Sequence, residues 1–185
     1  KFDFTSSGEP AGTTNTIRAG QTYYYYLISE IGELDGKDKL CDLEWQDYLP
    51  EYVEYTGSGL TMYHKTAGGS YTTDSLPSFG GWYISSDNEI IWTSGNGGNT
   101  DELYGKKYVL EIPVKVKSNF MKAPQNSNGL YYWSNKATLE TTYDDPTKNL
   151  TSNSVTTYLK YSLPGTKLTK VVTNASNLEA TTAEN

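Results

Sequence analysis

The chain has 185 residues, enough for one domain that buries its own apolar core without disulfide or metal staples. It carries 22 acidic and 15 basic side chains, a net charge of -7, and no basic cluster, so nucleic acid is not an expected partner. One cysteine and one histidine exclude an internal disulfide and leave no set of zinc ligands, and no motif indicates a cofactor or another metal.

Taken in chain order, short runs of strand-forming residues alternate with turn-forming residues. No run keeps the apolar spacing of a helix over three turns, although residues 118–128 allow one short helical turn. The predicted strands are residues 22–28, 40–48, 60–65, 81–85, 89–93, 108–117, 130–142 and 154–161. Eight or more short strands predict an all-β protein, a two-sheet β-sandwich of the immunoglobulin-like or Greek-key type.

The strand at residues 108–117 has the most regular pattern. The apolar side chains of one face are Tyr108, Leu110, Ile112, Val114 and Val116. The alternate positions are mostly charged, so we expect this second face to be solvated. Pro113 lies among them and lacks an amide hydrogen, which predicts a sheet edge or a bulge at this point.

The C-terminal part of the chain differs from the rest. A Leu-Pro-Gly sequence at residues 163–165 predicts a linker, and residues 170–177 resemble residues 1–8 in spacing and type. We therefore expect a sandwich domain at residues 1–161, then a linker and the possible first strand of a following module at residues 162–185. Neither a membrane span nor a signal peptide is expected within the sequence. If the parent protein is secreted, we expect its export signals to lie outside this sequence.

Three segments combine into a motif by their order and spacing. Lys1 opens the chain, Asp47 lies in Leu-Glu-Trp-Gln-Asp-Tyr-Leu-Pro, and Asn135 lies in Asn-Lys-Ala on a late strand. Together with the glycine-then-tyrosine segment at residues 20–25, they resemble the isopeptide-forming domains of Gram-positive pilins and surface adhesins. The resemblance covers residues 1–161. Within this group, the sequence is similar to the C-terminal domains of antigen I/II-type adhesins.

This resemblance implies that a side-chain amide joins Lys1 to Asn135, with Asp47 as the assisting acid. It also implies an extracellular module of a cell-wall-anchored bacterial surface protein, whose partners are neighbouring modules and a host or microbial ligand. The reaction is a single turnover on the protein itself, so no enzyme activity is expected. Because Lys1 is the first residue supplied, another lysine remains an alternative for the crosslink.

The chemistry has a physical basis that is independent of the family. A lysine amine attacks a carboxamide only when it is neutral and held in contact, and burial favours its neutral form. The same burial keeps a neighbouring carboxyl protonated, so that it can polarise the amide and transfer a proton. Glu44 is a rival acid on the same strand, but it lies three residues from Asp47 and is therefore expected on the opposite face.

Two other interpretations concern ligands. Tyr23 to Tyr26, with Trp82, Trp92 and Trp133, can line a carbohydrate groove in a binding module without a crosslink, although such aromatic residues more often pack in the core. Acidic residues at loop positions offer oxygen ligands to calcium, but their spacing is irregular and solvated turns are the better interpretation. These residues are Asp35, Asp38, Asp42, Asp144 and Asp145.

Overall fold

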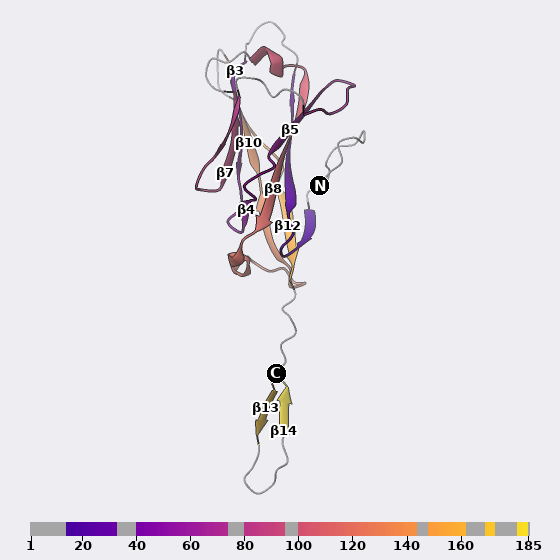
Figure 1. Cartoon of the computed structure of the whole chain (residues 1–185), viewed down its shortest axis with the longest axis vertical. Coiled ribbons are helices and arrows are strands. Elements are labelled where there is room, and N and C mark those ends of the chain that lie inside the picture. The colour runs from indigo at the N-terminus through magenta and orange to yellow at the C-terminus, as the bar shows by residue number, and fades with distance from the viewer. Residues whose placement is uncertain are drawn as a thin grey trace.

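A computed structural model describes residues 14–32, 40–73, 80–94, 100–143, 148–161, 169–172 and 181–184 (Figure 1). The first strands are β1 (Thr14–Arg18), β2 (Tyr23–Ile31), β3 (Leu40–Tyr48), β4 (Val53–Tyr55), β5 (Thr61–Thr66), β6 (Gly81–Ile84) and β7 (Glu89–Thr93). The later strands are β8 (Lys106–Val116), β9 (Tyr131–Asn135), β10 (Ala137–Tyr143), β11 (Lys148–Thr151), β12 (Val155–Lys160), β13 (Thr169–Val172) and β14 (Thr181–Glu184). Two short 3-10 helices occur in the described residues, η1 (Thr100–Leu103) and η2 (Ser118–Lys122), the second within the predicted helical turn. No described helix has the length and apolarity needed to cross a membrane.

The strands form a β-sandwich, as predicted from their number and spacing. One sheet has the order β11-β10-β3-β7-β6, and the sheet that contains β2 has the order β2-β8-β4, with β5 also paired to β8. A third sheet, β1-β12-β9, adjoins the first where β9 runs into β10 with only Lys136 between them. Within this third sheet β1 is parallel to β12, whereas β12 and β9 are antiparallel.

The core-facing side of β8 is as predicted, because Leu110, Ile112 and Val114 are buried. The expectation of a solvated second face was wrong, since Glu111 is also buried. The reason is that β8 is a central strand, with β2 along one side and β4 and β5 along the other. Tyr26 on β2 covers this face as well, and its hydroxyl donates a hydrogen bond to Glu111 Oε2 at 3.2 Å.

The prediction that Pro113 marks a sheet edge was wrong for the same reason. Proline is tolerated here because the strands on one side of β8 are interrupted. The β4 pairing ends at Tyr55 opposite Val114, and the β5 pairing begins at Thr61 opposite Glu111. Pro113 lies opposite the gap between β4 and β5, where a missing amide hydrogen removes no ladder bond on that side.

The predicted strand at residues 130–142 is divided in two. β9 pairs with β12 and β10 pairs with β3, so the chain passes from one sheet to another at Lys136. This division decides the position of the site, because Asn135 ends β9 beside the start of β10. The sequence patterns also did not predict β1, β4 and β11.

The C-terminal strands β13 and β14 are antiparallel and pair with no other described strand. Figure 1 shows them as a separate hairpin. The segments that join them to β12 and to each other lie outside the described residues. The division into residues 1–161 and 162–185 therefore stays a prediction.

Candidate crosslinking site

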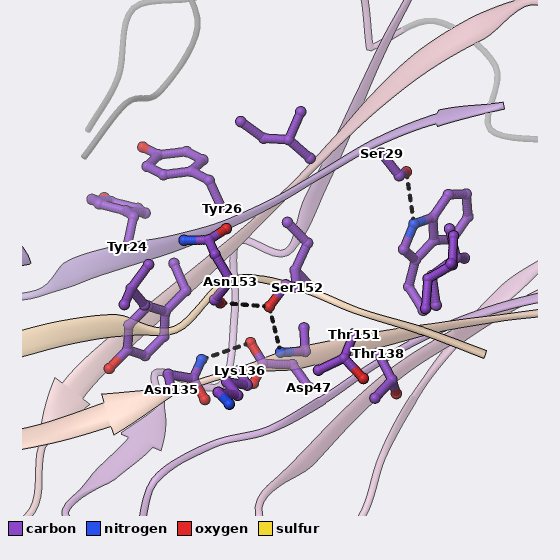
Figure 2. Close-up of a pocket in the computed structure, with 18 of the residues that line it drawn as sticks. Tyr24, Tyr26, Ser29, Asp47, Asn135, Lys136, Thr138, Thr151, Ser152 and Asn153 are labelled. Carbon is purple, nitrogen blue, oxygen red and sulfur yellow. Dashed lines mark hydrogen bonds between the residues drawn. The ribbon is translucent and has the colours of Figure 1, made fainter. Parts of the chain in front are cut away.

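Asp47 and Asn135 are brought together although 88 residues separate them in sequence. The Asn135 Nδ2 donates a hydrogen bond to Asp47 Oδ2 at 3.0 Å. Asp47 is 0% exposed and Asn135 is 6% exposed, so the contact is shielded from water. Figure 2 shows the two side chains pointing toward each other from neighbouring strands.

The alternation of side chains along the strands explains this meeting. On β3, Trp45 and Asp47 face the interior, while Gln46 between them is only half-buried. Asp47 is paired with Ala137, the first residue of β10. Asn135 lies two positions before Ala137 and shares its inward direction, whereas the intervening Lys136 is exposed. The adjoining ends of β9 and β10 therefore place the carboxamide against the carboxyl group.

Burial changes the acidity of Asp47. Desolvation raises the pKa of its carboxyl group to about 7, and the hydrogen bond from Asn135 opposes this rise only in part. Both the protonated and the ionised carboxyl are therefore available near neutral pH. The protonated form can donate a proton to a reacting amide, and the ionised form can accept one.

Two buried oxygens at this site have no hydrogen-bond partner among the described residues, namely Asp47 Oδ1 and Asn135 Oδ1. An unsatisfied buried polar atom costs roughly 1 to 3 kcal/mol. Native structures leave few such atoms without a structural or chemical reason. A 180° rotation of the Asn135 carboxamide would exchange the positions of its nitrogen and oxygen. In that orientation a protonated Asp47 could donate a hydrogen bond to the Asn135 carbonyl oxygen. Both oxygens can therefore accept a further hydrogen bond.

Aromatic side chains and one threonine form a hydrogen-bonded wall beside the pair. Trp133 Nε1 donates to the Tyr23 hydroxyl at 3.3 Å, and the hydroxyls of Tyr23 and Tyr25 are 3.4 Å apart. The Tyr25 hydroxyl lies 3.3 Å from Thr157 Oγ1 on β12. The pKa of Tyr25 is raised mainly by burial and slightly by the nearby charge of Asp47. The sequence favoured core packing for these aromatic residues but did not predict this network, which depends on the pairing of β9 with β12.

A groove of about 930 Å³ opens onto the pair (Figure 2). Its walls are β2 on one side and β10, β11 and residues 151–153 and 155–157 on the other, and Asp47 and Asn135 line it. Ser152 fixes this second wall, because its Oγ accepts from the Ala137 amide at 3.0 Å and donates to the Asn153 carbonyl at 2.8 Å. Figure 2 shows Ser152 and Asn153 beside the Asp47 and Asn135 pair.

Lys1 lies outside the described residues, so the structure tests only two of the three predicted site residues. Among the lysines whose side chains are described, none is buried. Lys136 is next to Asn135 in sequence but is exposed. The described part of the chain therefore offers no buried lysine amine to Asn135.

The rival acid is on the other face, as predicted. Glu44 is half-buried and pairs directly with Glu140 across β3 and β10. The interpretation of the tryptophans as core residues is also confirmed for Trp92 and Trp133, which are 0% and 5% exposed. Trp82 is half-buried and packs against the same core. An exposed aromatic row for sugar stacking is thus not built from these side chains.

Only one of the five candidate calcium ligands lies in the part of the chain that the structure describes. Asp42 Oδ1 accepts hydrogen bonds from Ser94 Oγ at 2.6 Å and from the Leu43 amide at 2.8 Å. This carboxylate oxygen is therefore engaged in hydrogen bonds between β3 and the end of β7. The described residues contain no group of three or more side chains suited to a metal ion. The other four candidates fall outside them: Asp35, Asp38, Asp144 and Asp145.

No family model matches the sequence, and no curated protein does. Solved structures do share the fold. The major pilin SpaD of Corynebacterium diphtheriae is 18% identical over 74% of this chain and 31% of its own, with a TM-score of 0.51. The N-terminal domain of the Streptococcus gordonii adhesin Sgo0707 is 13% identical over 80% of this chain and 30% of its own, with a TM-score of 0.53.

A third similar structure is the Enterococcus faecalis surface protein ACE, which binds its ligands by the collagen hug model. It is 9% identical over 77% of this chain and 48% of its own, with a TM-score of 0.51. The chain therefore spans about a third to a half of the solved chains that it matches. It has the β-sandwich fold found in domains of Gram-positive pilins and surface adhesins.

Proposed function

We propose that the chain is a structural or adhesive module of a Gram-positive bacterial surface protein, stabilised by a self-formed amide between Lys1 and Asn135. Asp47 is the acid that assists the reaction. The observation that carries this proposal is the shielded contact between Asp47 and Asn135, at 3.0 Å, with a carboxyl whose pKa burial raises to about 7. The shared fold with pilin and adhesin domains supports the same class.

The reaction conserves atoms without an external reagent. The neutral Lys1 amine attacks Asn135 Cγ while protonated Asp47 donates a hydrogen bond to the amide oxygen and stabilises the tetrahedral intermediate. Asp47 then relays a proton from the attacking nitrogen to Asn135 Nδ2. The bond between Cγ and Nδ2 breaks, ammonia leaves, and a new bond joins Cγ to Lys1 Nζ. Asp47 ends in the protonation state in which it began.

The crosslink suits a protein that resists pulling and proteolysis without disulfides. The amide closes a loop of more than a hundred residues, whose closure entropy is worth on the order of 4 to 5 kcal/mol by analogy with long disulfide loops. It also prevents the chain between the two strands from extending under force. The parent protein would then lie at the cell surface, anchored in the cell wall, with neighbouring modules and a host or microbial ligand as partners.

Intact-protein mass spectrometry tests the proposal. The wild type should be lighter than its sequence mass by one ammonia, whereas Lys1→Ala, Asp47→Ala and Asn135→Ala should each have their full sequence mass. Glu44→Ala is the matched control, because it removes a carboxyl from the opposite face of β3 and should leave the ammonia loss intact. A wild type at full sequence mass rejects the crosslink, and a loss that survives in Lys1→Ala assigns the nucleophile to another lysine.

A further inference from the structure

We propose that β12 is the strand that carries mechanical force through the module, because a pull on the two ends of the chain shears it against both of its neighbours. This inference rests on the proposed function only in that the parent protein is taken to be under tension, and its test does not require the crosslink. Three features support it: the direction of the strand pairs, the part of the chain that the crosslink leaves open, and the burial of the paired residues.

The first feature is the parallel pair of β1 and β12, in which Thr14 lies beside Thr156 and Arg18 lies beside Lys160. Figure 1 shows β1, in indigo, next to β12. A pull toward the N-terminus acts on β1 at its Thr14 end, and a pull toward the C-terminus acts on β12 at its Lys160 end. These are opposite ends of one ladder, so the strands must slide past each other. The hydrogen bonds of the ladder run mostly across this direction and therefore share the force.

The second feature is the part of the chain that the proposed crosslink does not enclose. An amide between Lys1 and Asn135 takes the force to the end of β9, and residues 136–160 stay on its route to the C-terminus. Val155 of β12 pairs with Asn135 itself, and Leu159 pairs with the first residue of β9. The force enters this antiparallel ladder at Asn135 and leaves it at the opposite end, so β12 is sheared against β9 as well. While the ladder holds, the intervening β10 and β11 cannot extend.

The third feature is the burial of paired residues in both ladders. Ile17 on β1 pairs with Leu159 on β12, and Thr157 on β12 pairs with Trp133 on β9. All four side chains are at most 5% exposed. The Thr157 hydroxyl also lies 3.3 Å from that of Tyr25, which links β12 to β2. Hydrogen bonds are stronger in such surroundings than in water, so these ladders should resist shear better than exposed ones.

Force spectroscopy of the full-length Lys1→Ala/Cys41→Ser protein tests this route without the crosslink. Pulling on the two termini should shear β12. Pulling instead on the C-terminus and on a cysteine introduced by Arg18→Cys, at an exposed position of β1, should open the same ladder from its Lys160 end. The rupture force between the termini should be at least about twofold higher, because five residue pairs then share the force and do not separate one after another. Equal rupture forces overturn the proposal.

A matched pair of core variants gives a second test in the same Lys1→Ala/Cys41→Ser protein. Ile17 on β1 and Ile31 on β2 are 5% and 7% exposed, but only Ile17 belongs to a ladder of β12. Ile17→Ala and Ile31→Ala each leave a cavity in the core, so both should lower the melting temperature. Only Ile17→Ala should lower the rupture force between the termini, because forced unfolding follows the barrier along the pulled route. Equal losses of force in the two variants overturn the proposal.

The length released from the wild type separates this proposal from the crosslink. With the amide in place, rupture should lengthen the molecule by less than about 100 Å, since only residues 136–160 extend, at roughly 3.4 Å each. In Lys1→Ala the whole sandwich extends, and the step should be several hundred Å. A long step in both proteins at the higher force rejects the crosslink and supports the role of β12. A short wild-type step at the force that opens the ladder from Arg18→Cys supports the crosslink and overturns the role of β12.

Discussion

The two faces of β3 present two carboxyl groups in very different surroundings. Asp47 faces the interior and is fully buried, with the Asn135 amide as its hydrogen-bond partner. Glu44, three residues earlier, faces outward and lies opposite Glu140. The pKa of each carboxyl is raised above its ordinary value, but that of Asp47 rises to about 7 and the shift at Glu44 is smaller.

The causes of the two shifts show how a fold gives two carboxyl groups on one strand different acidities. At Glu44, partial desolvation is followed by repulsion from Glu140, Asp42 and Glu89, and water and salt weaken such repulsion. At Asp47, desolvation raises the pKa and the hydrogen bond from Asn135 opposes the rise. The inner carboxyl keeps its proton up to near neutral pH because the interior disfavours its charge and the hydrogen bond from Asn135 offsets this effect only in part.

The largest expected effect on stability comes from placing a carboxyl group in the core where no amide, such as that of Asn135, can hydrogen-bond to it. Val114 is 0% exposed and packs in the same core cluster as Tyr25 and Trp133. Val114→Asp should destabilise the protein by several kcal/mol, enough to unfold it, because an unpaired charge would be buried. Thermal and urea unfolding measure the effect. Lys115→Ala is the control, because its exposed ion pair with Glu54, at 3.2 Å, contributes about 1 kcal/mol or less. A cooperative transition of Val114→Asp at the wild-type midpoint would show that this face of β8 is not core.

A smaller effect is expected in the pH dependence of Asp47. The pKa of this carboxyl in the folded protein is about 7, above its ordinary value of 3.8, so the folded state holds the proton more tightly. Its contribution to stability is complete below pH 4 and is lost as the pH rises to about 7. Each pH unit in this window is worth at most about 1.4 kcal/mol.

The measurement compares urea unfolding of Lys1→Ala with Lys1→Ala/Asp47→Asn between pH 3 and 9, so that no crosslink forms in either protein. The difference in the free energy of unfolding should fall from pH 4 to 7 by no more than about 4 kcal/mol and then level off. Lys1→Ala/Glu44→Gln should show a weaker change over the same range. A flat difference for Asp47 would mean that this carboxyl is ionised throughout and cannot serve as the acid.

The sequence predicted the class of fold, and the structure brings two of the predicted site residues into contact, but the strand pairing around them was not predicted. Asp47 and Asn135 were named through the resemblance to isopeptide-forming domains, and period-two alternation correctly separated Asp47 from Glu44. Alternation alone could not show that residues 130–142 change sheets at Lys136, because both strands continue the same pattern of side chains. The contact between the two site residues depends on that change.

Other errors have a similar origin in long-range pairing. A strand that alternates apolar and charged residues is expected at a half-exposed position, yet β8 is central and Glu111 is buried beneath its neighbours. Short strands such as β4, with three residues, carry too little periodicity to be recognised. These features are decided by which strands pair across the sheet, and a local pattern of residues does not contain that information.

The smallest expected effect on stability concerns Glu44, the carboxyl group on the outer face of β3. Glu44 and Glu140 are directly opposite each other, and two like charges at such a cross-strand position are destabilising. Glu140→Lys should replace this repulsion by attraction and raise the free energy of unfolding by roughly 0.2 to 1 kcal/mol at low salt. The gain should shrink as salt is added, because Glu140 is exposed and its field is screened. Urea unfolding at two ionic strengths measures it, with Thr138→Lys on the same strand face as the control opposite Gln46. A gain of equal size in both variants would mean that added positive charge stabilises this acidic protein generally and that the Glu44 and Glu140 pair has no particular role.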